Sequence, residues 1–103
     1  MPHRKAPRST DQRAQLRQRG GAWLRQQRKQ RGLSQREVSE HLGIDSHTFI
    51  SAIESGGPAL PEERWEEYAK ILGTDWPAFC IKMMMYFKPN IYTACFGKHL
   101  KRT

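Results

Sequence analysis

The 103-residue chain is predicted to be all-α, and three observations support this. Apolar residues recur mostly at spacings of three and four, which is the spacing of a helix face. Residues suited to capping helices stand before these segments, and glycines such as Gly32, Gly43 and Gly73 follow them, where helices commonly end. The length allows one small domain with tails.

Two short helices joined by a tight turn are predicted within residues 33–56. Ser34 is a good N-cap, and Glu37 stands three residues later, which completes a capping box. Val38 and Leu42 are four residues apart and share one face of the first helix.

The second of these helices follows a glycine turn. Gly43 closes the first helix, and either Asp45 or Ser46 caps the second. Ile50 and Ile53 supply its buried stripe. Two short amphipathic helices around such a turn are typical of a helix-turn-helix motif.

A larger set of residues carries a family resemblance: Leu24, Arg25, Arg28, residues 32–35, 42–44 and 50–56, and more weakly Ala69, Leu72 and Gly73. Together they resemble the Cro/repressor-like (Xre-type) helix-turn-helix family of transcriptional regulators over roughly half of the chain. The resemblance implies a compact five-helix bundle, here with an extra short C-terminal helix and a disordered basic N-terminal arm. The stretch between Ile44 and Ile50 is one residue longer than is usual in the family, and Val38-Ser39 stands where Leu-Ala is common.

The resemblance also implies site residues, because the second helix of the motif lies in the major groove in this family. The base-reading positions are Ser46, His47, Thr48, Ser51 and Ala52. His47 can exchange hydrogen bonds with a base edge, and Thr48 can bond an edge or press its methyl group on thymine. An exposed polar role remains the alternative for His47, whereas Phe49 is expected to face inward.

Phosphate contacts are expected from residues beside this helix: Gln35 and Ser55 by resemblance, Arg36 as the nearest cation, and Arg25 and Lys29 from the strongly basic first helix. The alternative for these cations is an ordinary solvated face. The resemblance further implies that Arg28 and Glu54 form a structural ion pair between helices rather than a DNA contact.

Charge favours a polyanionic partner, since the net charge is +8. It is also unevenly placed: residues 1–36 hold eleven basic residues against one acid, residues 37–87 three against nine, and residues 88–103 add four more bases. Double-stranded DNA is the expected partner.

The N-terminal residues 1–20 are predicted to be a basic, largely disordered arm that either contacts DNA or is a solvated tail. A frayed helix at 11–19 would be broken by Gly20-Gly21, and the first firm helix would span 22–31. The helix-turn-helix domain is assigned to 21–74.

A helix starting at Pro61 is predicted to bury Trp65, Tyr68, Ala69 and Leu72. Its glutamates, at 62, 63, 66 and 67, are expected on a solvated face, with contact to RNA polymerase as a weaker hypothesis.

Residues 75–97 are predicted to be a helical extension used for dimerisation, with a cap at Thr74 or Asp75, a last short helix at 91–96 and a basic tail at 98–103. Its broad apolar surface is rich in methionine and aromatic residues, which suits packing against another chain. The expected dimer interface comprises Phe79, Met83, Met84, Phe87, Ile91, Tyr92 and Phe96. Additional core within one chain is the alternative.

Several classes of protein are not expected. Cys80 and Cys95 are too few and too widely spaced for a disulfide framework or a zinc finger, and no metal or other cofactor is anticipated. An enzyme is not expected, because the sequence has no pattern typical of a nucleophile, metal or phosphate-loop site. There is neither an apolar stretch long enough to span a membrane nor a secretory signal, so a cytoplasmic, nucleoid-associated location is expected.

The sequence therefore predicts a sequence-specific double-stranded DNA-binding transcriptional regulator that binds palindromic sites as a homodimer. The alternative is an antitoxin-like protein that binds a partner through its C-terminal helices and autoregulates through its helix-turn-helix.

Overall fold

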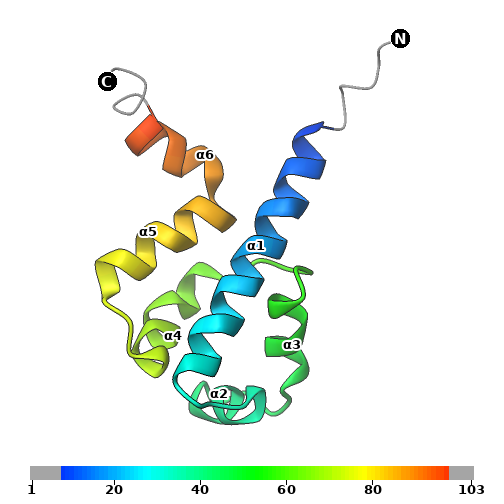
Figure 1. Cartoon of the computed structure of the whole chain (residues 1–103), viewed down its shortest axis with the longest axis vertical. Coiled ribbons are helices and arrows are strands. Elements are labelled where there is room, and N and C mark those ends of the chain that lie inside the picture. Colours follow the sequence, from blue (N-terminus) through cyan, green and yellow to red (C-terminus); the bar gives the residue numbers. More distant parts are fainter. Residues whose placement is uncertain (1–7, 98–103) are drawn as a thin grey trace.

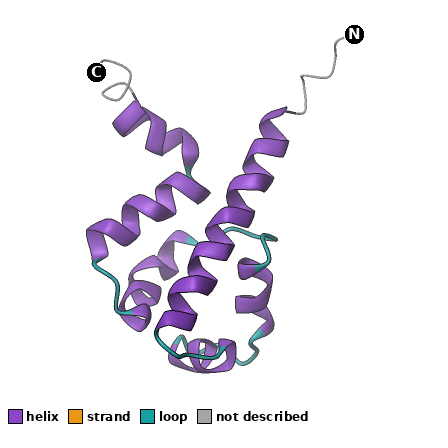
Figure 2. Ribbon diagram, viewed as in Figure 1, coloured by secondary structure: helices purple, strands orange, loops and turns teal. Residues whose placement is uncertain are grey.

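The computed structural model describes residues 8–97 of the chain, with side chains from residue 12 onward, and this part is helical without strands (Figures 1 and 2). The prediction of an all-α fold is confirmed. The elements are α1 (Arg8–Gln30), α2 (Gln35–His41), α3 (Thr48–Glu54), the 3₁₀ helix η2 (Glu62–Arg64), α4 (Trp65–Leu72), α5 (Trp76–Phe87), α6 (Pro89–Tyr92) and a π-helical turn, η3 (Thr93–Gly97).

The longest helix, α1, runs through Gly20-Gly21 without interruption, so the predicted break there is wrong. Residues 8–20, expected to belong to a disordered arm, form the first half of this helix, and the rest of that arm lies outside the described residues. The boundary expected between arm and domain at residue 20 therefore falls inside α1.

The two glycines are retained in the helix because α1 approaches two neighbours closely at this point. A Cβ on Gly20 would lie 2.7 Å from Tyr86 Cβ, and a Cβ on Gly21 would lie 2.6 Å from the carbonyl oxygen of Glu54. Both distances are shorter than ordinary van der Waals contacts. Glycine is a poor helix former, but at these two positions it allows α1 to pack closely against α3 and α5.

Local capping signals work largely as predicted. The Ser34 hydroxyl accepts from Glu37 N at 3.0 Å while Glu37 Oε1 accepts from Ser34 N at 2.7 Å, which confirms the capping box of α2. Gly43, with φ +74°, follows α2, and Asp75 caps α5 by accepting from Ala78 N at 3.2 Å.

The core lies where α1, α3, α4 and α5 meet. Its buried apolar residues include the predicted face of α4, namely Trp65, Tyr68, Ala69 and Leu72, together with Leu24, Val38, Leu42, Ile50, Ile53, Leu60, Phe79, Met83 and Phe87. Phe79 sits at its centre, with ring centroids 5.8 Å from Trp23 and 6.5 Å from Tyr68. This core holds both helices of the motif against α1.

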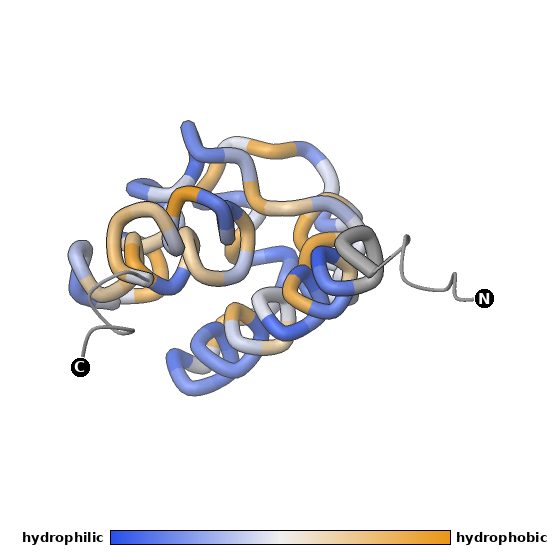
Figure 3. Tube along the Cα trace, turned by 90° about the horizontal axis from the view of Figure 1, so that it is seen from above, coloured by the Kyte–Doolittle hydropathy of each residue, from blue (hydrophilic) through white to orange (hydrophobic). Residues whose placement is uncertain are grey.

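The C-terminal end differs slightly from the prediction of a helix over 91–96. Pro89 starts α6 rather than only ending α5, since a proline fits the first turn of a helix, and the chain then widens into η3. In Figure 1, α6 and the first half of α1 diverge at the end of the molecule that carries both termini. Figure 3 contrasts the mostly hydrophilic trace of α1 with the more hydrophobic trace near the C-terminal end.

Within the described residues, no helix is both long enough and apolar enough to cross a membrane.

Candidate nucleic-acid interface

The helix pair α2 and α3 presents one face of α3 to solvent. Ile50 and Ile53 of α3 are fully buried, which fixes the rotation of the helix. Thr48, Ser51 and Ala52 follow the spacing of a single helical face and remain exposed or half-exposed. A short, uncharged and accessible stripe therefore runs along α3 on the side away from the core.

The start of α3 differs from the predicted cap. The helix begins at Thr48, and His47 occupies the N-cap position with no capping hydrogen bond from its side chain. The Ser46 hydroxyl still accepts from Thr48 N at 3.2 Å, and its Oγ lies 2.9 Å from Thr48 Oγ1. Ser46 and Thr48 thus hold each other in place, while His47 is exposed between them.

The neighbouring aromatic, Phe49, is half-buried and packs against the core, as expected for a residue that faces inward.

A buried ion pair fastens α3 to α1. Arg28 Nε lies 2.7 Å from Glu54 Oε2, and Arg28 Nη2 donates to Glu54 Oε1 at 2.9 Å. The two side chains are only 8% and 3% exposed. This paired, two-bond geometry is the strong form of an arginine–carboxylate contact. The hydrogen bond to Glu54 raises the pKa of Arg28, against the opposing effect of burial.

The same pair also fixes the start of α2. Arg28 Nη1 donates to the carbonyl oxygen of Leu33 at 2.8 Å, and Gln35 Nε2 donates to Glu54 Oε1 at 3.0 Å. One of the two amide hydrogens of Gln35 is therefore committed inside the protein. The ends of α1, α2 and α3 meet at a single hydrogen-bonded junction.

Several predicted phosphate contacts surround this junction. Arg25, Gln35 and Ser55, together with Ser51 of the base-reading set, line a hollow of about 230 Å³ whose lining also includes Arg28 and Glu54. Ser55 Oγ donates to the carbonyl oxygen of Ala52 at 3.0 Å, which leaves its oxygen free to accept.

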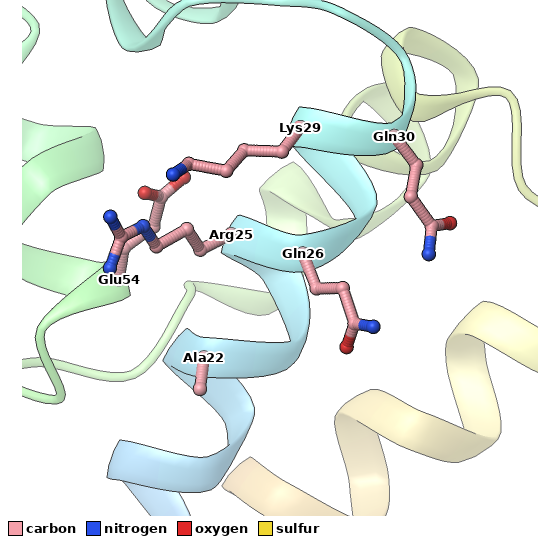
Figure 4. Close-up of a pocket in the computed structure, with 6 residues that line it drawn as sticks. All are labelled: Ala22, Arg25, Gln26, Lys29, Gln30 and Glu54. Carbon is pink, nitrogen blue, oxygen red and sulfur yellow. The ribbon is translucent and has the colours of Figure 1, made fainter.

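An adjoining hollow of about 650 Å³ is lined by Ala22, Arg25, Gln26, Lys29, Gln30 and Glu54. Figure 4 shows Arg25 and Lys29 extending from α1 toward Glu54. The structure thus brings Arg25, Lys29, Gln35 and Ser55 together, whereas Arg36 is exposed on α2 and lines neither hollow.

The predicted dimer residues divide into two groups. Phe79 and Met83 are completely buried and Phe87 is 8% exposed, all within the chain's own core. Assigning these three to a dimer interface is wrong, because α1 and α4 already cover them. Met84, Tyr92 and Phe96 are half-buried and Ile91 is 48% exposed, so these four remain accessible.

The expected list of dimer residues omits the outward apolar face of α5, although Ile81 and Met85 visibly widen the apolar surface of this segment in the sequence. Ile81 is 39% exposed, and Met85, four residues later, is half-exposed. A signal for them was present, since Lys82 is the single charged residue in the twelve-residue helix. A helix that is apolar on all sides is usually covered on all sides.

Metal binding has no support in the described part of the chain, where no group of three or more His, Cys, Asp or Glu side chains could hold an ion.

The sequence also matches a known protein family. The model of a family described as a helix-turn-helix domain matches residues 20–78, more than half of the chain. Comparison with curated proteins and with solved structures gave no significant match. The matched segment runs from the glycine pair of α1 to the first turn of α5 and so contains the α2–α3 pair and the Arg28–Glu54 junction. The chain belongs to the helix-turn-helix domain family.

Proposed function

We propose that the protein is a sequence-specific double-stranded DNA-binding transcriptional regulator of the Cro/repressor-like (Xre) type, with α3 as its recognition helix. The observation that carries this proposal is the outward stripe of α3, which is held rigidly by buried Ile50 and Ile53 on the opposite face. A helix of this size with short polar side chains fits the major groove.

Base reading is assigned to the exposed residues at and after the start of α3: Ser46, His47, Thr48, Ser51 and Ala52. His47 is the most informative of them, because its ring is exposed and makes no capping hydrogen bond with the start of α3. Its nitrogens suit the acceptors of guanine, while the methyl groups of Thr48 and Ala52 suit thymine.

Contacts with the DNA backbone are assigned to four polar and basic residues around the Arg28–Glu54 junction, namely Arg25, Lys29, Gln35 and Ser55, and to the exposed Arg36 of α2. These side chains come from α1, α2 and the end of α3, so they can follow one phosphate strand beside the groove that α3 enters. The excess of positive charge in residues 1–36 supplies the salt-dependent part of the affinity.

Homodimerisation is assigned to the C-terminal extension, residues 75–97, which would place two recognition helices on a palindromic site. The apolar residues Ile81, Met84, Met85, Ile91 and Tyr92 support this, because they extend over α5 and α6 and each remains exposed or only half-buried. An antitoxin-like heterologous partner would use the same surface, and sedimentation of the purified protein separates the two cases.

The test of the proposed function is selection from a random duplex pool, followed by binding measurements on the selected site and on random duplex. We expect His47→Ala to lose discrimination by about 1–3 kcal/mol. His41→Ala is the matched control, since His41 is an exposed histidine in the last turn of α2. Failure to enrich any sequence at moderate ionic strength would refute the proposal.

A further inference from the structure

A third hollow, apart from the two beside the Arg28–Glu54 junction, is lined by residues of α1, of the connection after α3 and of the α5–α6 junction. Figure 1 shows where these elements lie. The volume of the hollow is about 330 Å³, and its lining includes Arg13, Arg17, Pro58, Ala59, Tyr86 and Pro89. None of these residues is among the base-reading or phosphate-binding residues assigned above, and none is among the five apolar residues named for the dimer interface, although Tyr86 and Pro89 belong to the C-terminal extension. The proposed function therefore gives this hollow no role.

Positive charge is concentrated on one wall of this hollow. Arg13 and Arg17 are one helical turn apart on α1, and neither forms an ion pair with any side chain in the described part of the chain. Arg17 Nε donates to the carbonyl oxygen of Gly57 at 2.9 Å, which anchors one edge of the guanidinium. Its two terminal nitrogens still carry four donor hydrogens.

The rest of the lining includes three side chains that carry rings. Tyr86 belongs to α5, Pro89 starts α6, and Pro58 lies in the connection after α3. Flat, rigid side chains of this kind offer stacking surfaces to a planar group. A carboxylate near this hollow, that of Glu62, already forms an ion pair with Lys88, with Oε2 2.7 Å from Nζ. It therefore does not compete for the two arginines.

We propose that this hollow binds a small molecule that carries a carboxylate on a flat apolar ring. The guanidinium groups of Arg13 and Arg17 bind the carboxylate, because a planar guanidinium can donate two parallel hydrogen bonds to the two oxygens of a carboxylate. Tyr86 and the two prolines hold the ring. The volume is at the lower end of the range of about 300–1,000 Å³ for small-molecule sites, which suits a single substituted ring.

The experiment is a titration of the full-length, isotope-labelled protein with benzoate, followed by amide chemical shifts and without DNA. We expect saturable shifts at Gly57, Ala59 and Tyr86. Arg13→Gln is expected to weaken benzoate binding by about tenfold, which corresponds to loss of one charge-assisted contact. Arg19→Gln removes the same charge from an exposed position of α1 outside the hollow and is expected to leave the binding unchanged.

Two further ligands test the chemical class. Benzamide, which has the ring without the negative charge, is expected not to bind, and inorganic phosphate, which has charge without a ring, is expected to shift these amides far less than benzoate. The proposal is overturned if benzoate gives no saturable shift or if phosphate binds as tightly as benzoate. It is also overturned if Arg13→Gln and Arg19→Gln change the affinity for benzoate to the same extent. Because no step uses DNA, these outcomes are independent of whether α3 reads bases.

Discussion

Arg28 and Glu54 are 26 positions apart in the sequence and form two hydrogen bonds, of 2.7 and 2.9 Å, inside the protein. Gln35 and the carbonyl oxygen of Leu33 complete the junction. The recognition helix proposed above is therefore fixed at its C-terminal end by charge and on its inner face by the core.

Removing one partner of this pair is predicted to cost far more than removing both. Glu54→Ala leaves the Arg28 guanidinium buried without a counter-charge and should lower the free energy of unfolding by about 3–5 kcal/mol. The double variant Arg28→Met with Glu54→Leu should recover much of that loss, because neither charge is then buried. Urea denaturation of both proteins measures the difference, and equal losses would contradict a buried, coupled pair.

Gly21→Ala is predicted to destabilise the protein although alanine is the better helix former. The new methyl group would lie 2.6 Å from the carbonyl oxygen of Glu54 and close to that of Ile53, and backbone atoms cannot move aside easily. The expected loss is about 1–3 kcal/mol, against a gain of about 1 kcal/mol from propensity alone. Thermal denaturation measures it. Gln26→Ala, at an exposed position of the same helix, serves as the control and should change little.

Tyr68→Phe is predicted to leave stability unchanged or to raise it slightly. The hydroxyl of Tyr68 is buried and has no hydrogen-bond partner among the described residues, and its burial raises the pKa of the phenol. Deleting a buried polar group without a partner removes a desolvation cost without losing a bond. Denaturation of the variant should agree with the wild type within about 0.5 kcal/mol or exceed it. A clear loss would mean that the hydroxyl is bonded in solution.

The capping box predicts a pH dependence. Hydrogen bonds with Ser34 lower the pKa of Glu37 from its ordinary value of 4.5. The bond from the backbone N–H of Ser34 has the larger effect, and the bond with its side chain has the smaller one. A carboxyl whose pKa is lower in the folded state stabilises that state above the ordinary pKa and loses this effect as the pH falls through the folded value. Glu37→Ala should therefore reduce stability more at pH 7 than at pH 3, as measured by urea denaturation at both values. An equal effect at both would contradict a charged cap.

Ile81→Glu is predicted to weaken self-association without unfolding the chain. Ile81 projects from α5 toward solvent, so the monomer tolerates a charge there, but an interface over α5 would bury that charge without a partner. Analytical ultracentrifugation should show the dimer dissociation constant rising by about tenfold or more. Ala78→Glu, at an exposed position one turn earlier, tests how far the interface extends. A wild-type chain that is monomeric at high concentration would remove the basis for this prediction.

The elements that sequence reasoning placed well are those determined by local chemistry. Ser34 with Glu37, Gly43 and Asp75 each act on neighbours within a few residues, so their effect on the backbone follows from the sequence alone. The apolar face of α4 was equally clear, because polar residues occupy the other side of that helix.

The elements that it missed depend on contacts between distant segments. The sequence around Gly20-Gly21 suggests a break, and only the close approach of α3 and α5 explains a continuous helix. In α5 the apolar residues surround the helix, so periodicity could not decide whether Phe79, Met83 and Phe87 pack inside the chain or against a second copy. Arg17 reaches Gly57, forty positions away, which no spacing rule would indicate.

The uninterrupted α1 has a mechanical consequence. One continuous helix touches the proposed recognition helix through Gly21 and the C-terminal extension through Gly20, two adjacent positions that leave no room for a side chain. On the α3 side the contact is with the backbone carbonyl oxygens of Ile53 and Glu54, and on the α5 side it is with Tyr86 Cβ and the ring of Phe87, so a displacement of either neighbour acts directly on the backbone of α1. If two copies join through their C-terminal helices, the continuous α1 of each copy fixes the distance between the two proposed recognition helices. A DNA site with a different half-site spacing would then be bound only if the duplex bends, because the protein would not adapt.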